Sequence, residues 1–171
     1  MVPRRKPVIV RMISSGWHDG YAEVNFGQNT SMDLLDLSGK LLHLDWSQIK
    51  WVCLVRDFPA TALDPVNPER LLHKKFALRP RTPGLWLRLN LADGDELEGI
   101  AANDRSLIAG SGLLLTPPDT RSITQRIFVP LAAIQSLEVV ALIGASGRRR
   151  SPAPQNQPEL FPSGPQSLTQ L

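Results

Sequence analysis

Residue types that could perform acid–base or metal chemistry are few and scattered in this sequence. The three histidines lie far apart, at His18, His43 and His73. Four carboxylates gather in one short segment, at Asp93, Asp95, Glu96 and Glu98. A segment of this kind between alternating apolar residues is typical of the solvated turn and outer face of a hairpin rather than of a calcium loop. We therefore expect no metal ion, and we expect His43 to face solvent from its strand.

Motifs for covalent or phosphate chemistry are also missing. No Gly-x-Ser-x-Gly elbow occurs, and Ser38-Gly39-Lys40 lacks the preceding glycine of a phosphate-binding loop. Cys53 is the only cysteine and lies in the apolar run 51–55, which excludes an internal disulfide and a cysteine-based zinc site and predicts a buried thiol. The sequence thus predicts a protein that is not an enzyme and holds no cofactor.

The C-terminal segment, residues 144–171, is rich in Gly, Ser, Pro and Gln and has too few apolar residues to form a core, so we expect it to be disordered. One isolated apolar pair stands within it, in Gln157-Pro158-Glu159-Leu160-Phe161. This order resembles the peptide with which bacterial proteins bind the DNA sliding clamp, although Pro158 replaces the common leucine. The resemblance implies that Gln157 hydrogen-bonds in a groove while Leu160 and Phe161 fill an apolar pocket. We expect the tail to dock a protein partner, with the clamp as the named candidate.

Nucleic acid is the alternative partner. Residues 12–67 carry 3 bases and 7 acids and residues 83–143 carry 4 and 7, whereas residues 68–82 carry 5 bases and 1 acid. Two acidic bodies would repel a phosphate backbone, and only the connector and the chain ends would attract it. The residues that would contact RNA or DNA are Arg4, Arg5, Lys6, Lys74, Lys75, Arg79, Arg81, Arg148, Arg149 and Arg150. The other interpretation of these charges is a solvated basic linker.

Two parts of the chain resemble one another. Residues 41–55 align with residues 126–140 without a gap, and their apolar positions coincide. The coinciding pairs are Leu42/Ile127, Leu44/Val129, Trp46/Leu131, Ile49/Ile134, Val52/Leu137 and Val55/Val140. Upstream, residues 7–23 align with residues 84–101 if the second copy has two more residues in its turn, which matches Arg11 with Arg88 and Gly20 with Gly99. The pattern predicts a duplicated unit.

Each copy reads as about five short alternating strands, with bends at residues 45–48 and 130–133. Five strongly bent strands in so short a chain can close into a small barrel, which removes exposed edges. We therefore predict an all-β fold with two tandem small Sm-like or SH3-like barrels, residues 1–64 and 83–143. Residues 65–82 form a basic, partly helical connector, with helix expected within residues 69–78, and the disordered tail follows. Trp51 and Trp86 are the expected interface residues.

The second copy resembles the Sm/Hfq small-barrel family. The resemblance rests on Asp93-Gly94, Leu97, Gly99 and Asp104, followed by two last strands joined through a very short bend. It implies a five-stranded barrel; RNA-binding members carry an Asn or His segment in their loops, where this chain has Ile108. With GYAEVNF, KWVCLVRDF, RPRTPGLW and RIFVP, the whole chain is similar to an uncharacterised bacterial family of duplicated Sm-like domains. That similarity implies no known activity.

Hydropathy bounds the cellular location. The apolar runs are far shorter than the roughly 20 residues of a membrane-spanning helix, and the first twelve residues offer only Val8–Val10 as an apolar stretch, too short for a secretory signal. We expect a cytosolic protein.

Overall fold

The computed structural model describes residues 5–14, 16–26, 29–58, 74–118 and 122–144. These residues form an all-β protein. The first half contains β1 (Lys6–Met12), β2 (Trp17–Ala22), β3 (Ser31–Asp36), β4 (Leu41–Asp45), the 3-10 turn η1 (Trp46–Gln48) and β5 (Ile49–Val55). The second half contains β6 (Gly84–Leu91), β7 (Glu96–Ala101), the one-turn helix α1 (Ser106–Ala109), β8 (Gly112–Thr116), β9 (Thr124–Pro130), η3 (Leu131–Ala133) and β10 (Ile134–Ile143).

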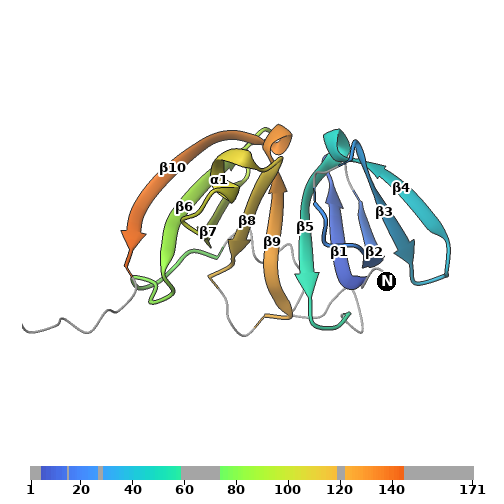
Figure 1. Cartoon of the computed structure of the whole chain (residues 1–171), viewed down its shortest axis with the longest axis horizontal. Helices are drawn as coiled ribbons and strands as arrows, with labels where there is room; N and C mark the ends of the chain where they lie inside the picture. Colours follow the sequence, from blue (N-terminus) through green and yellow to red (C-terminus); the bar gives the residue numbers. More distant parts are fainter. Residues whose placement is uncertain (1–4, 15, 27–28, 59–73, 119–121, 145–171) are drawn as a thin grey trace, which may run out of the picture.

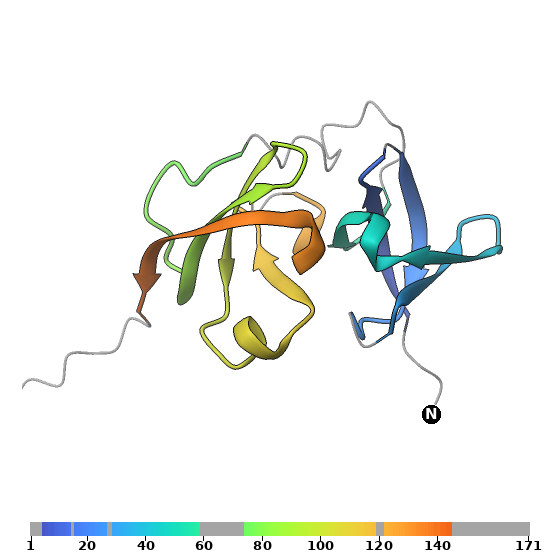
Figure 2. The ribbon, with the colours of Figure 1, turned by 90° about the horizontal axis from the view of Figure 1, so that it is seen from above.

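The ten strands form one open antiparallel sheet in the order β10-β6-β7-β8-β9-β5-β1-β2-β3-β4 (Figure 1). Figure 2 shows the same ribbon from above, with the two halves side by side. The expected five strands per copy and the two bends, now η1 and η3, are confirmed. Within the described residues, β4 and β10 each pair on one side only, so the edges that closed barrels would have removed are present.

The pairing register repeats between the two halves. Val8 lies opposite Gly20, and Leu87 lies opposite Gly99. On its other side Val8 faces Leu54. Leu87 likewise faces Val139, the residue that the alignment of 41–55 with 126–140 equates with Leu54. The strand order β5-β1-β2-β3-β4 therefore recurs as β10-β6-β7-β8-β9, and the duplication predicted from the sequence is a duplication of structure.

The same register corrects the upstream alignment. Because Val8 corresponds to Leu87, Arg88 corresponds to Ile9 and not to Arg11, and the second copy has no extra residues in its turn. The turn between the first two strands is short, since β1 ends at Met12 and β2 begins at Trp17. The arginines of the two segments, Arg11 and Arg88, therefore do not occupy equivalent positions.

Gly20 and Gly99 both lie inside strands, and close backbone approach explains both. A Cβ at Gly20 would lie 2.3 Å from the Leu35 carbonyl oxygen, and a Cβ at Gly99 would lie 2.8 Å from the Leu115 Cβ. Glycine in a strand interior commonly marks such an approach. These glycines let the sheet bend tightly at the same place in each half.

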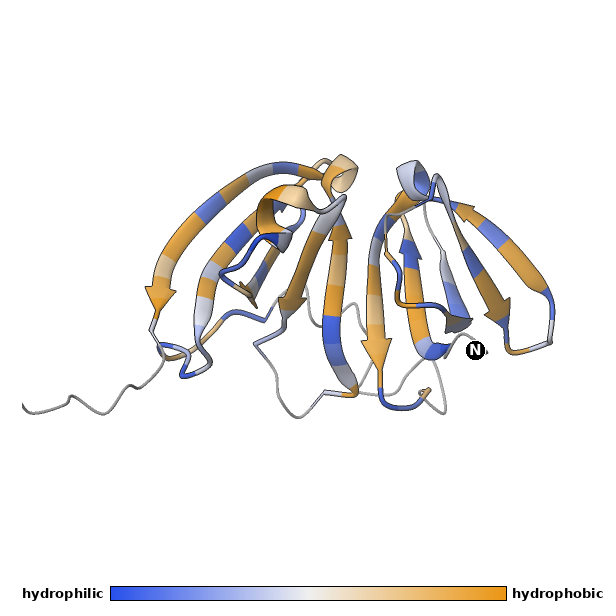
Figure 3. Ribbon diagram, in the orientation of Figure 1, coloured by the Kyte–Doolittle hydropathy of each residue, from blue (hydrophilic) through white to orange (hydrophobic). Residues whose placement is uncertain are grey.

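Each half has its own buried cluster, and β5 contributes to both. Val52 and Leu54 pack with residues of β1, β3 and β4 in the first cluster. Trp51, Cys53 and Val55 point to the other face and pack with residues of β6 to β9 in the second. Figure 3 shows apolar and polar residues alternating along many of the strands. Alternation sends successive side chains to opposite faces, so one fully buried strand can serve two cores.

The connector lacks the predicted helix in the part that the structure describes. Residues 74–78 contain no helix, and the remainder of the expected helical stretch, residues 69–73, lies outside the described residues. No helix among the residues that the structure describes is long and apolar enough to cross a membrane.

Candidate functional site

The junction of the two halves is built by β5 and β9, whose register places Val52 opposite Phe128 and Cys53 opposite Ile127. Trp51, an expected interface residue, is 2% exposed there, and its ring centroid lies 6.0 Å from that of Trp17. The Cys53 thiol is buried as expected, and burial raises its pKa to about 12. A thiol with so high a pKa is not a nucleophile near neutral pH.

A lysine ties the halves together beside this junction. Lys50, at the start of β5, is buried, and its Nζ forms ion pairs with Asp93 and Asp95 in the turn between β6 and β7. The same ammonium lies 4.8 Å from the centroid of the Trp51 ring. Partial burial raises the pKa of Asp93, but the hydrogen bond and the charge of Lys50, together with backbone hydrogen bonds in the turn, outweigh it, and the pKa is lowered overall. Both carboxylates therefore have a cation of the protein itself as partner.

The other half of the acidic segment is not the solvated face that the sequence suggested. Glu98 is only 3% exposed. It accepts a hydrogen bond from the Arg88 guanidinium at 3.1 Å and one from the backbone N–H of Phe76 at 2.9 Å. The connector therefore covers this face of the sheet and supplies a donor to the buried carboxylate, an arrangement that strand alternation alone does not predict.

Trp86, the second expected interface residue, lies under the same connector. Its ring centroid is 5.5 Å from that of Phe76 in an edge-on arrangement. It is half-buried, and the ring that covers part of it belongs to the same chain.

Side chains that could bind a metal ion do not gather among the described residues. No group of three or more His, Cys, Asp or Glu side chains suited to a metal ion occurs among the described residues. His43 is exposed, as expected, and its Nδ1 lies 2.6 Å from an Asp33 carboxylate oxygen on the neighbouring strand. His73 lies outside the described residues.

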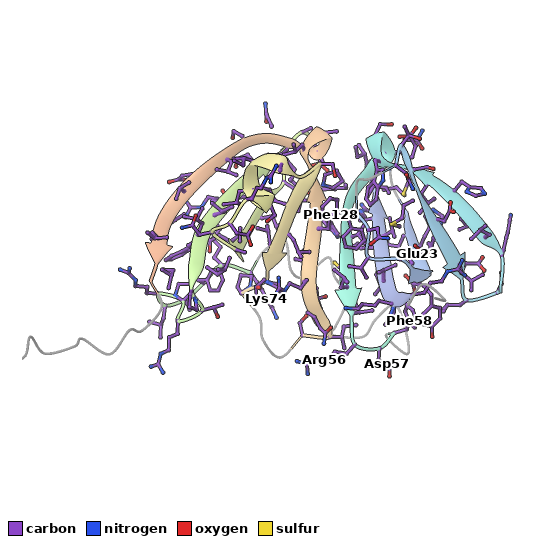
Figure 4. The ribbon with its side chains drawn as sticks, viewed as in Figure 1. Glu23, Arg56, Asp57, Phe58, Lys74 and Phe128 are labelled. Atoms are coloured by element: carbon purple, nitrogen blue, oxygen red, sulfur yellow. The ribbon has the colours of Figure 1, made fainter. Side chains whose placement is uncertain are left out.

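The basic residues are divided between two places. Arg5 lines a cavity of about 850 Å³ beside β3, together with Glu23, Asp33 and Trp46. Lys74 and Lys75 line a different cavity, of about 430 Å³, with Phe76 and Pro118; Figure 4 labels Lys74 below the second half. Lys6 begins β1. The other described candidates, Arg79 and Arg81, are exposed in the connector.

Several of these side chains already have partners in the chain. Lys75 forms an ion pair with Glu96, and an Arg79 guanidinium nitrogen lies 3.3 Å from the Leu142 carbonyl oxygen. The ion pair lowers the pKa of Glu96. Within the described residues, the candidate cations do not form one continuous patch. Arg4, Arg148, Arg149 and Arg150 lie outside those residues, as do the tail residues Gln157, Leu160 and Phe161.

Three aromatic rings gather at the junction, and sequence reasoning did not single out this group. The Phe26 centroid lies 4.8 Å from that of Phe128, and the Trp46 centroid lies 5.4 Å from that of Phe128. Trp46 and Phe128 also line a cavity of about 180 Å³ between η1 and the end of β9. Figure 4 shows Phe128 between β9 and the first half. The alignment of residues 41–55 with residues 126–140 could have indicated this group, because it matches Phe128 with the polar His43.

The two edge strands expose apolar side chains. On β10, Leu137, Val139 and Leu142 are 45%, 54% and 57% exposed, and on β4 Leu41 is 43% exposed. Long apolar edges are prone to pair with another strand. These edges and the divided basic residues are the exposed features on which a binding function can rest.

Comparison with known proteins adds one finding. Residues 4–141 match a family described as a family of unknown function (DUF6982). No curated protein matches the chain, and neither does any solved structure.

Proposed function

The chain belongs to the DUF6982 family, whose function is unknown, and we propose that it is a cytosolic, non-enzymatic binding and adaptor protein. In this proposal each half is a small Sm-like or SH3-like barrel, and the segment after residue 143 recruits a protein partner. The DNA sliding clamp is the partner that the Gln157-Pro158-Glu159-Leu160-Phe161 sequence favours.

One observation carries the proposal. The last strand of the folded body, β10, ends at Ile143, and the isolated apolar pair Leu160-Phe161 stands well beyond it in a segment without other large apolar side chains except leucines near its end. An apolar pair gains free energy when a partner buries it, roughly 3–5 kcal/mol of gross transfer before ordering costs. That amount is consistent with micromolar binding.

The direct test is fluorescence anisotropy of a labelled peptide spanning residues 151–171, titrated with a bacterial sliding clamp. A peptide with Leu160→Ala and Phe161→Ala is the first control, and Glu159→Ala is the matched control because the proposal gives that side chain no contact. Saturable binding that is lost only in the first control supports the proposal. Equal binding of all three peptides, or none by the unchanged peptide, contradicts clamp recruitment.

RNA or DNA binding is the second candidate function, favoured by the exposure of Lys75, Arg79 and Arg81 in the connector. Binding of this kind must weaken steeply as salt rises, because phosphate contacts release counterions. Titration of labelled single-stranded RNA and DNA at several salt concentrations tests it. The acidic balance of both halves opposes this candidate, and we place it second.

A further inference from the structure

Asp19 and Glu98 occupy the same position in the two halves, but their surroundings differ. By the repeated register, Asp19 of β2 corresponds to Glu98 of β7. Asp19 lies opposite Ile9, and Glu98 lies opposite Arg88. The Arg88 guanidinium donates to Glu98 at 3.1 Å, whereas the Ile9 side chain has no hydrogen-bonding group. The first half therefore has the carboxylate of this position without its arginine.

No described residue takes the role of the missing arginine. Asp19 is half-buried, and among the residues that the structure describes none donates a hydrogen bond to it or forms an ion pair with it. The neighbouring His18 lowers the pKa of Asp19, but burial outweighs this effect and the pKa is raised. The Arg11 guanidinium lies 5.0 Å from the centroid of the Trp17 ring, and one of its nitrogens lies 3.4 Å from the Gly16 carbonyl oxygen. A cation brought by another molecule would therefore stabilise the ionised Asp19.

Aromatic rings lie on both sides of Asp19 along β2. Trp17 and Tyr21 are two residues before and after it, and strand alternation turns the three side chains to one face. The Trp17 ring already has the Arg11 guanidinium over it. Tyr21 is 41% exposed, and its ring meets that of Phe58 edge-on, with centroids 5.4 Å apart. Figure 4 shows Phe58 at the lower end of the first half.

We propose that Asp19 and Tyr21 bind an arginine side chain of a basic segment of another protein. The guanidinium would pair with the Asp19 carboxylate and lie against the Tyr21 ring. The second half shows how such a carboxylate is satisfied, because Arg88 there lies beside Glu98. Arginine fits better than lysine, since its planar guanidinium matches a carboxylate with two donors and also stacks on aromatic rings.

The charge of the first half suits a basic partner. Residues 12–67 carry 3 bases and 7 acids. The first arginine of this chain's own tail, Arg148, follows the end of β10 by only five residues, and β10 is separated from β2 by six strands in the sheet order. The partner is therefore a separate molecule. This surface lies on β2 and does not depend on what the tail binds.

A nuclear magnetic resonance titration of the full, isotope-labelled chain tests the proposal. The probe is a synthetic peptide, Gly-Ser-Arg-Arg-Ser-Gly, and the comparison peptide has lysine in place of both arginines. The arginine peptide is expected to shift the backbone amide signals of residues 19–21 in a saturable way. The lysine peptide should bind about fivefold more weakly, because an ammonium neither forks onto the carboxylate nor stacks in the same way.

Two variants with the same loss of charge locate the site. Asp19→Asn keeps the shape of the side chain and removes its charge, and it should weaken binding of the arginine peptide about tenfold. Asp33→Asn is the matched control, because Asp33 lies on β3 with His43 as its partner; it should bind the peptide as the unchanged chain does. Tyr21→Ala should also weaken binding, by less than Asp19→Asn.

The remaining outcomes overturn the proposal. Absence of saturable shifts at residues 19–21 removes the site. Equal weakening by Asp19→Asn and Asp33→Asn shows attraction to the overall charge instead of a site, and equal binding of the two peptides removes the preference for arginine. Shifts confined to Glu98 and Arg88 show that the peptide competes for the second half instead. The titration contains no clamp and no tail peptide, so its result is independent of the test of tail recruitment.

Discussion

β5 and β10 occupy the same position in the two halves, and they differ in almost every property of their side chains. All seven residues of β5 are buried, whereas β10 has only Ile143 buried. On the face that β5 turns to the second half it carries Trp51 and Cys53; at the matching places β10 carries Ser136 and Glu138. The comparison shows that a further neighbouring strand determines whether this face of the repeated strand is apolar and buried.

The opposite face of the two strands did not diverge in the same way. Val52 and Leu54 match Leu137 and Val139, which are apolar although they are exposed. These side chains lie on the core-facing side of the sheet in both halves. β10 is therefore polar where it meets solvent from the back of the sheet and apolar where a further strand would complete the core.

The first test of this contrast places a charge at matched positions of the two strands. Val52→Asp buries an unpaired carboxylate and should lower the free energy of unfolding by about 4 kcal/mol or more. Leu137→Asp leaves the carboxylate in contact with water and should lower it by less than about 1 kcal/mol. Urea denaturation at low protein concentration measures both. Equal losses would show that β10 is as buried in solution as β5.

The second test concerns the lysine that joins the halves. Asp93→Asn with Asp95→Asn leaves Lys50 buried without a counter-charge and should cost about 3 kcal/mol. Lys50→Met removes the buried charge itself and leaves two partly exposed carboxylates, so it should cost about 1 kcal/mol or less. The same denaturation experiment compares them. A larger loss for Lys50→Met than for the double variant contradicts this description of the junction.

The third test compares Glu98 with its counterpart Asp19, which the register places at the same point of β2. Glu98→Gln exchanges one acceptor oxygen for an amide nitrogen that cannot accept from Arg88 or the Phe76 N–H, and should cost about 2 kcal/mol. Asp19→Asn serves as its matched control, with no comparable loss expected. If both substitutions destabilise equally, the connector does not anchor to Glu98 as described.

The fourth and smallest effect is a dependence on pH at Asp19. Burial raises the pKa of this carboxyl above its ordinary value, against a smaller lowering by His18. The folded state thus binds the proton more tightly than the unfolded chain, and the ionised form destabilises the fold as pH rises through the ordinary carboxyl range. Asp19→Asn should be more stable than the unchanged chain at neutral pH, by about 1 kcal/mol or less because the group is partly solvated. The difference should vanish in acid; a difference that grows as pH falls contradicts it.

Much of the repeat was predictable from the sequence because alternation and the gapless match of residues 41–55 with 126–140 depend on local pattern. The upstream alignment was wrong because it matched Arg11 with Arg88, two half-buried residues whose type the backbone does not constrain. Gly20 and Gly99 were the better anchors, since close approach of a neighbouring strand requires glycine there.

Features that depend on distant partners were not predictable. The burial of Glu98 requires a donor from the connector, Phe76, and the pairing of Lys50 requires the turn that holds Asp93 and Asp95. The sequence alone does not distinguish a solvated charged residue from one that forms an ion pair across the junction. The open sheet likewise depends on which strands join the two halves. These are β5 and β9, whose paired residues lie far apart in the chain.

Amide hydrogen exchange of the full chain at low protein concentration tests the central claim most directly, namely that β10 is a β5-like strand lacking its second neighbour. At low concentration the outward-facing amides of β10 and β4 should exchange fast while those of β5 and β9 stay protected. Outward amides of β10 that are as protected as those of β5 would contradict the account.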